Sequence, residues 1–366
     1  MKKVFFALNI IVGLSGYLLI FFIWRYFFGL HDIYMQSVVA GLLALLAILT
    51  VLTAFFAHRH DNIFSRAFYL VIGLWSGLML NTVLVAVFLL LLDWVFFSDF
   101  YFLTPLFKAY FLGIFSILML IPESILAQSF VIKRYVIKIK ALPDAWVGRK
   151  VIHISDVHLG PVWRQRFFDK LVRRVNSLAA DVIFITGDLF DGMEADFSWF
   201  HERKFIAPLG VFYAFGNHDL ILGADKVHKL LSHADIQILD NARQEIEGLQ
   251  IIGLTCYYEG RLDVKGKILS SVGYDPLKPS IMMYHEPKDI DAARTAGIDL
   301  QLSGHTHAGQ LFPFNLLSQI LYRGFNHGLY RLPDFSLSVT AGVGTWGPPL
   351  RLGSRSEIVV LELSKA

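Results

Sequence analysis

The stretch VIFITGDLFD at residues 182–191 decides the fold of the second half of this chain. Val182 to Ile185 form a continuous apolar run, which is typical of a strand covered on both faces of a parallel sheet. Gly187, Asp188 and Asp191 follow that run directly. Open α/β sheets bind ligands at the carboxyl ends of their strands, so a binding site is expected here.

Other segments repeat this arrangement, with polar residues closing a short apolar run. Each offers Asp, Asn or His, the oxygen and imidazole ligands that divalent first-row metals prefer. One such segment alone is weak evidence, but the full series predicts a metal site at one edge of a sheet. In chain order the other segments are Asp156-Val157-His158, Gly216-Asn217-His218-Asp219, His285 and Gly304-His305-Thr306-His307.

The second half alternates strand and helix patterns. A helix with one apolar face at 167–178 lies between the strands 151–155 and 181–186, which predicts a βαβ unit. Further helical patterns lie at 224–233 and 287–296. Further strands are expected at 210–215, 250–254, 280–284, 298–302, 335–340 and 357–363.

The first 130 residues have a membrane composition. The chain is 55% hydrophobic and 17% charged, and nearly all of the apolar excess precedes residue 131. A transmembrane helix needs about 20 apolar residues. The first apolar run is too long for a cleaved signal peptide and has no small-x-small cleavage site after it. We expect four spans, at 4–24, 33–57, 67–92 and 109–130, the last interrupted by Pro122 and Glu123.

Basic residues predict the orientation of these spans. With four spans, the basic clusters at 2–3, 58–66 and 133–140 share one face, which the positive-inside rule makes cytoplasmic. Arg25 and Lys108 fall on the other face, which also carries Trp24, Tyr26, Trp94 and Tyr101 as an interfacial aromatic belt. The assignment inverts if the run 109–130 does not span.

The net charge gives no indication of nucleic-acid binding, and the cysteine content excludes an intrachain disulfide. The net charge of +3 gives no footprint of nucleic-acid binding. Cys256 is the only cysteine, so no intrachain disulfide forms.

The motif order DxH, GDxxD, GNHD, H and GHxH resembles the calcineurin-like metallophosphoesterase superfamily, over roughly residues 131–366. The segments around Gly304–Gln310, Gly328–Tyr330, Gly342–Gly344, Pro349–Leu352 and Glu357 are similar to its YkuE-type membrane-associated branch. The apolar runs predict an all-α transmembrane bundle of about four helices at 1–130, a region that the resemblance does not cover. The resemblance implies an α/β domain of two packed mixed β-sheets flanked by helices at 131–366.

The resemblance also assigns roles at the site. Asp188, between the outer ligand groups in sequence, is expected to bridge two divalent ions, which are Mn, Fe, Zn or Mg. His218 is the expected general acid, with Asp219 orienting its imidazole. Asp191 either caps a helix or hydrogen-bonds a ligand. One ion is assigned to Asp156, His158 and His307, and the other to Asn217, His285 and His305.

Two local expectations accompany these roles. Residues i and i+2 of an extended segment point the same way, which suits D-x-H and H-x-H to ligand duty. Gly187, Gly216 and Gly304 are expected to let the backbone approach the ions closely. The remaining histidines are interpreted as structural: His153 as a packed core residue, His228 and His233 as solvated or helix-end residues.

Related membrane-associated members act on lipids or lipid-linked phosphodiester and pyrophosphate compounds. We therefore expect hydrolysis of a phosphoester or pyrophosphate in a phospholipid or lipid-linked substrate. The partner is the lipid bilayer, with the protein multi-pass in a bacterial inner or plasma membrane. The apolar stretch Leu311–Leu317 either guides acyl chains or packs in the core. Alternatives are a nucleotide or phosphoprotein phosphatase tethered for location, and a non-catalytic membrane sensor.

The orientation is testable with a reporter fused after Ala366. Because the basic clusters share one face, the reporter should read cytoplasmic. Paired phosphatase and fluorescent-protein fusions measure this, since each is active on only one side of the membrane. A periplasmic reading would indicate an odd number of spans.

Overall fold

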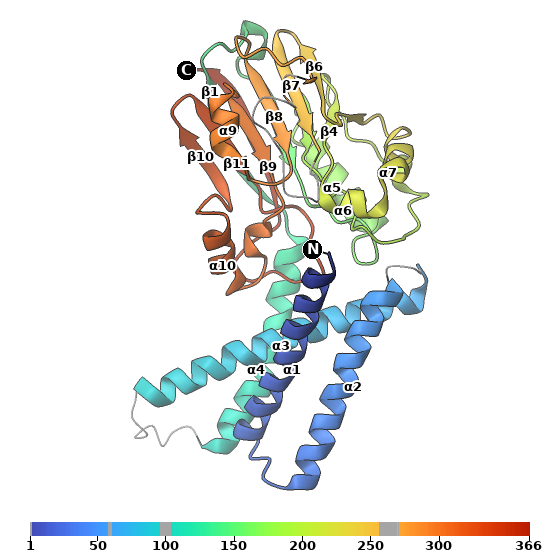
Figure 1. The fold of residues 1–366 in the computed structure, drawn as a ribbon, viewed down its shortest axis with the longest axis vertical. Helices are drawn as coiled ribbons and strands as arrows, with labels where there is room; N and C mark the ends of the chain where they lie inside the picture. The colour runs from blue at the N-terminus through green and yellow to red at the C-terminus, as the bar shows by residue number, and fades with distance from the viewer. Residues whose placement is uncertain (1, 58–60, 96–103, 256–268, 270) are drawn as a thin grey trace. The chain divides into compact units, whose positions relative to one another are not determined.

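The computed structural model describes residues 2–57, 61–95, 104–255, 269 and 271–366, with side chains at 2–14 and 54–57 left aside. The chain forms two compact units (Figure 1). One contains Met1–Ile125 with Gly347–Leu350, and the other contains Leu126–Trp346 with Arg351–Ala366. Residues 58–60, Tyr101 and Cys256 lie outside the described residues. The domain boundary at residue 130 stays a prediction.

The first unit contains α1 (Lys2–Phe27), α2 (Ile33–Ala57), α3 (Ile63–Val95) and α4 (Pro105–Gln128). In the part described, three helices are long and apolar enough to cross a membrane: Ile33–Thr53, Ile63–Val95 and Pro105–Gln128. These correspond to the second, third and fourth predicted spans, and α4 continues past Pro122. The predicted span at 4–24 lies mostly before Ser15, where side chains are not described.

Polar side chains inside the first unit pair with one another. The hydroxyl of Tyr17 lies 2.6 Å from that of Thr50 and accepts a hydrogen bond from the Trp75 indole at 3.1 Å, which links α1, α2 and α3. Asn81 on α3 donates to the carboxylate of Glu123 on α4 at 3.2 Å, and both side chains are buried. Such pairing is how apolar helix bundles accommodate polar groups.

The second unit is built on two six-stranded sheets. The first has the order β1-β12-β2-β3-β4-β5, and the second has the order β10-β11-β9-β8-β7-β6. The strands of the first are β1 (Val131–Ile139), β12 (Glu357–Lys365), β2 (Lys150–Ile154), β3 (Val182–Ile185), β4 (Val211–Tyr213) and β5 (Gln237–Ile238). Those of the second are β10 (Gly328–Leu332), β11 (Phe335–Val339), β9 (Leu300–Ser303), β8 (Ser280–Tyr284), β7 (Leu249–Leu254) and β6 (Ala242–Ile246).

The predicted fold class is confirmed, and every predicted strand is present. The helices predicted at 167–178, 224–233 and 287–296 are α5 (Gln165–Asn176), α7 (Ala224–Leu231) and α9 (Ile290–Thr295). Strands β1, β5, β6 and β10 were not predicted. These four strands are half exposed, so they lack the continuous apolar run of a covered strand.

Packing on both faces of β3 explains its apolar sequence. Val182 and Phe184 lie in the core between the two sheets, together with Ile251 and Met283 of the second sheet. The alternate residues Ile183 and Ile185 pack in the core formed with α5 and α7. A third core beneath α9 covers the outer face of the second sheet. Burial on both sides leaves the strand ends as the place for polar chemistry.

Candidate metal centre

The predicted ligands lie on loops that follow the carboxyl ends of strands in both sheets. Asp156 and His158 follow β2, Asp188 follows β3, and Asn217 begins the short helix α6 (Asn217–Leu222) after β4. His285 follows β8, and His305 and His307 follow β9. All seven therefore meet at one edge of the two-sheet unit, as the sequence predicts.

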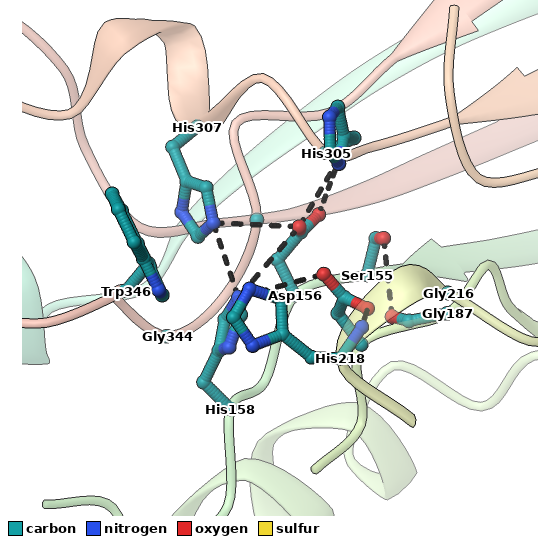
Figure 2. Close-up of polar contacts among 12 residues, drawn as sticks. Ser155, Asp156, His158, Gly187, Gly216, His218, His305, His307, Gly344 and Trp346 are labelled. Carbon is teal, nitrogen blue, oxygen red and sulfur yellow. Dashed lines mark hydrogen bonds and ion pairs between the residues drawn. The ribbon is translucent and has the colours of Figure 1, made fainter. Parts of the chain in front are cut away.

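One group consists of Asp156, His158 and His307. The Nε2 atoms of His158 and His307 are 3.1 Å apart, and the His307 Nε2 is 3.4 Å from Asp156 Oδ1. All three side chains are buried. Figure 2 shows both rings directed toward the carboxylate. Two imidazole nitrogens converging on a carboxylate form a donor set suited to a divalent cation.

A second group consists of Asp188, His285 and His305. His285 Nε2 lies 3.0 Å from Asp188 Oδ2 and 3.1 Å from His305 Nδ1. The other ring nitrogen of His285 is 2.7 Å from the Thr186 carbonyl oxygen, which orients its Nε2 toward the site. The Asn217 Oδ1 atom is buried with no hydrogen-bond partner among the described residues. An unsatisfied buried oxygen is costly unless a ligand uses it, so Asn217 also fits a metal site.

Asp188 connects the two groups. Its Oδ2 lies 3.0 Å from His285 Nε2 and 3.9 Å from His158 Nε2. Its Oδ1 accepts a hydrogen bond from the His218 backbone N–H at 2.8 Å. Burial alone would raise the pKa of Asp188, but the surrounding histidines hold it well below its usual value. A single ionised carboxylate thus contacts a member of each group, the position that a bridging ligand requires.

The backbone of these loops is strained at the ligands. Asp156 (φ 53°), His158 (φ 52°), Asp188 (φ 51°), His305 (φ 70°) and His307 (φ 49°) all adopt left-handed conformations. For non-glycine residues such conformations cost about 1–3 kcal/mol each and cluster at functional sites. The expectation that D-x-H and H-x-H are extended is therefore wrong. These ligands converge because each loop turns sharply, which an alternating strand would not do.

Glycines admit this close approach. A Cβ on Gly304 would lie 2.3 Å from Asp156 Oδ2, and one on Gly216 would lie 2.1 Å from Asp188 Oδ1. Neither position accommodates a side chain without displacing a predicted ligand. Close packing of the backbone at Gly304 and Gly216 is confirmed, against the side chains of Asp156 and Asp188.

Asp219 does not orient His218, so that expected role is wrong. Its buried carboxylate accepts hydrogen bonds from the backbone N–H groups of Asp188 (2.6 Å), Gly216 (2.9 Å) and Phe190 (3.1 Å). Burial and the neighbouring Asp188 raise the pKa of Asp219 to about 6. Asp219 therefore fixes the loop that carries Asp188. The His218 ring is held instead by the Asp191 carbonyl oxygen, 3.0 Å from Nδ1.

Asp191 contacts two histidines, His218 through its backbone carbonyl and His158 through its side chain. Its side-chain Oδ1 is 3.0 Å from His158 Nδ1, so the ring presents Nε2 to His307 and Asp156. Burial alone would lower the pKa of His158, but the hydrogen bond and charge of Asp191 raise it. Of the two roles left open for Asp191, hydrogen bonding to a predicted ligand is confirmed.

Arg351 has a role that sequence reasoning missed. Its guanidinium is fully buried and donates to the carbonyl oxygens of Ala341 (2.6 Å), Gly344 (2.7 Å) and His307 (3.2 Å). Burial lowers its pKa to about 10, so it stays cationic at neutral pH. The backbone N–H of Gly344 in turn donates to the Asp156 carbonyl oxygen at 2.8 Å. Arg351 thus ties together the segments that support Asp156 and His307. Its place in the motif at 349–352 was the only signal.

The remaining histidines mostly behave as predicted. His153 is buried in β2, with its Nε2 2.8 Å from the Thr186 hydroxyl. His228 and His233 are exposed, at the end of α7 and just beyond it. His327, for which no role was predicted, lies 3.0 Å from the buried carboxylate of Glu357.

Two aromatic side chains flank the candidate centre. The Trp346 ring lies 6.2 Å from that of His218, and the Tyr322 ring lies 6.2 Å from that of His305. Figure 2 shows Trp346 beside His307. The Gln310 side chain accepts from the Trp346 backbone N–H and donates to its carbonyl oxygen, each at 3.0 Å. The candidate centre is therefore bordered by aromatic side chains at His218 and at His305.

Comparison with known proteins identifies related chains. A family model described as calcineurin-like phosphoesterase matches residues 149–309. An uncharacterized metallophosphoesterase of Campylobacter jejuni is 36% identical over 228 residues, covering 61% of each chain. A transmembrane protein with metallophosphoesterase domain from Danio rerio is 32% identical over 247 residues, covering 63% of this chain and 56% of that one.

The uncharacterized metallophosphoesterase YkuE of Bacillus subtilis is 28% identical over 250 residues, covering 63% of this chain and 84% of YkuE. These matches confirm the resemblance drawn from the motifs. The aligned region spans about three fifths of the length of the Campylobacter and Danio relatives.

The role of Arg351 predicts a specific defect. Arg351→Met removes the guanidinium donor from the carbonyl oxygens at 307, 341 and 344, and each hydrogen bond from a charged donor contributes about 1.5–3 kcal/mol. Thermal stability and bound metal should both fall, with partial rescue by Arg351→Lys. Melting curves and elemental analysis measure the two effects. Arg355→Met, at an exposed position of the same segment, is the matched control. Wild-type melting and metal content in Arg351→Met would contradict the role.

Proposed function

Because this chain belongs to the calcineurin-like phosphoesterase family, we propose that it is a metal-dependent hydrolase of phosphoester or pyrophosphate bonds in lipid or lipid-linked substrates. The observation that carries the proposal is the pair of ligand groups meeting at the Asp188 carboxylate. The proposed location is a membrane, with the catalytic domain on the cytoplasmic face. Nucleic acid is not a proposed partner.

The residues present fit two divalent ions. Asp156, His158 and His307 would hold one, and Asn217, His285 and His305 the other, with Asp188 shared. Such ions stabilise negative charge on a phosphoryl group and activate water. The chain itself contributes the loops that hold these side chains at fixed positions. Asp191 orients His158, and the Thr186 carbonyl orients His285. This support means that little reorganisation is needed when substrate binds.

His218 is proposed to protonate the leaving-group oxygen. Its ring is edge-on to His158, with centroids 4.8 Å apart, and only partly buried. Because Nδ1 donates to the Asp191 carbonyl oxygen, the ring keeps that proton and exchanges the one on Nε2. This geometry suits a general acid.

Two features support a lipid substrate. Within the described residues, three helices are long and apolar enough to cross a membrane, which would bring the protein to the bilayer where lipid substrates lie. In addition, Trp346 and Tyr322 border the candidate centre with aromatic surface. Trp and Tyr are the residues enriched where apolar chains meet polar headgroups.

Product analysis tests the substrate class. Full-length protein with Mn²⁺ should convert a component of a membrane lipid extract to a dephosphorylated or cleaved product, detected by mass spectrometry. Asp188→Asn should abolish the conversion because it weakens the charge shared by both ligand groups. Asp225→Asn, at an exposed position on α7, is the control. Cleavage of small phosphoesters with unchanged lipids would reject the lipid substrate, and no cleavage of either would reject the hydrolase.

The role of His218 predicts a dependence on the leaving group. His218→Ala should retain metal but lower turnover by roughly 10²–10⁴ on a substrate with an alkyl alcohol leaving group. The loss should shrink for p-nitrophenyl phosphoesters, because p-nitrophenolate needs little protonation. Steady-state rates across a leaving-group series measure this. An equal loss across the series would assign the general acid elsewhere.

A further inference from the structure

The helix α10 (Phe314–Leu321) buries a polar side chain and exposes its large apolar side chains, the opposite of a usual surface helix. Ser318 is buried at 7% exposure, and Asn315 is also turned partly inward. The large apolar residues point outward, with exposed fractions from 49% at Leu317 to 74% at Ile320. Phe314, Leu316 and Leu321 are exposed in the same way. A helix on a water-facing surface would bury the apolar residues and expose the polar ones.

The segment before α10 extends this surface. Phe312 is exposed, whereas Leu311 is buried. Of the two interpretations of Leu311–Leu317, core packing is therefore wrong for every apolar side chain except Leu311. Phe312 and the five outward residues of α10 form one apolar surface, here called the α10 face. Its members are Phe312, Phe314, Leu316, Leu317, Ile320 and Leu321.

We propose that the α10 face inserts into the headgroup boundary of the lipid bilayer. The inward-facing residues of α10 are polar, and its outward-facing residues other than Gln319 are apolar, so apolar surroundings match this helix. A bilayer is the apolar surrounding that the apolar helix α4 would bring: α4 ends at Gln128, and β1 begins at Val131. A link of two residues keeps the second unit within reach of the membrane. Single apolar helices of this kind bind at the interface plane rather than crossing it.

The residues flanking the α10 face fit an interface. Tyr322 follows the helix directly, and Trp346, 53% exposed, is held by Gln310. Such rings prefer the depth of the lipid headgroups. Arg323 and Arg355 are also exposed, and cationic side chains attract anionic headgroups. Because Trp346 and Tyr322 also border the candidate centre, a lipid at this interface would present its headgroup to the ligands.

A fluorescence experiment on the full-length protein tests the contact. Cys256 is the only cysteine, so Cys256→Ser with Ile320→Cys allows one environment-sensitive probe on the α10 face. The protein is placed in nanodiscs of phosphatidylcholine and phosphatidylglycerol. The probe should emit at shorter wavelength and be quenched by lipids with brominated acyl chains. Ile206→Cys, at an apolar position 69% exposed in a loop, is the matched control and should be quenched only by aqueous iodide.

Each outcome decides the proposal. Iodide quenching of the Ile320 probe would place the face in water and overturn it. Protection from both quenchers would mean that protein covers the face, either a second copy of the chain or its own helices, and would also overturn it. The readout needs no hydrolysis, so it is independent of the proposed function. If lipids are also the substrate, Leu317→Glu with Ile320→Glu should lower the rate on lipid roughly tenfold or more. The rate on soluble phosphoesters should stay unchanged.

Discussion

The rest of the structure depends on holding two buried carboxylates and four histidines at one edge of two sheets. Asp156 and Asp188 are both fully buried, and their nearest side-chain partners are imidazole rings. Burying a charge without a partner is costly, so this edge folds only when the rings, or cations bound with them, offset the carboxylates. Because both faces of the first sheet are packed with apolar side chains, these charged groups lie at the strand ends, on the loops that carry the proposed ligands.

Fixed backbone hydrogen bonds hold these loops in their strained conformations. Asp219 accepts hydrogen bonds from three backbone N–H groups, one of them that of Asp188. Arg351 donates to the carbonyl oxygens of His307 and Gly344. One residue is a buried acceptor and the other a buried donor, and neither lies in a predicted ligand group. Their common effect is that left-handed conformations costing about 1–3 kcal/mol each become the stable ones. Rigid support of this kind keeps ligand positions constant during a reaction.

Features that depend on neighbouring residues were predicted from the sequence, whereas contacts between distant segments were not. The convergence of the seven proposed ligands and the covered strands were predicted because residue type and apolar runs are local patterns, as at Val182–Asp191. Asp219 was assigned the wrong partner because its hydrogen bonds depend on a turn that brings β3 and β4 loops together. Arg351 was missed as a functional residue because no pattern shows which carbonyls a buried guanidinium will meet. The α10 face was left open for a similar reason, since apolar residues look alike whether they are buried or exposed.

The reversed faces of α10 and the ligand at His307 belong to one continuous segment. His307 lies in a short 3-10 turn, Leu311 anchors the chain in the core, and α10 follows at once. Ser354 accepts from Arg351 and donates to the Gln310 carbonyl, so the same buried cation that supports His307 also fixes the start of the apolar segment. A force on α10 from the proposed contact with lipid would therefore be resisted at Arg351 and Ser354, next to His307. This coupling would let the apolar face contact lipid while the candidate centre kept its geometry.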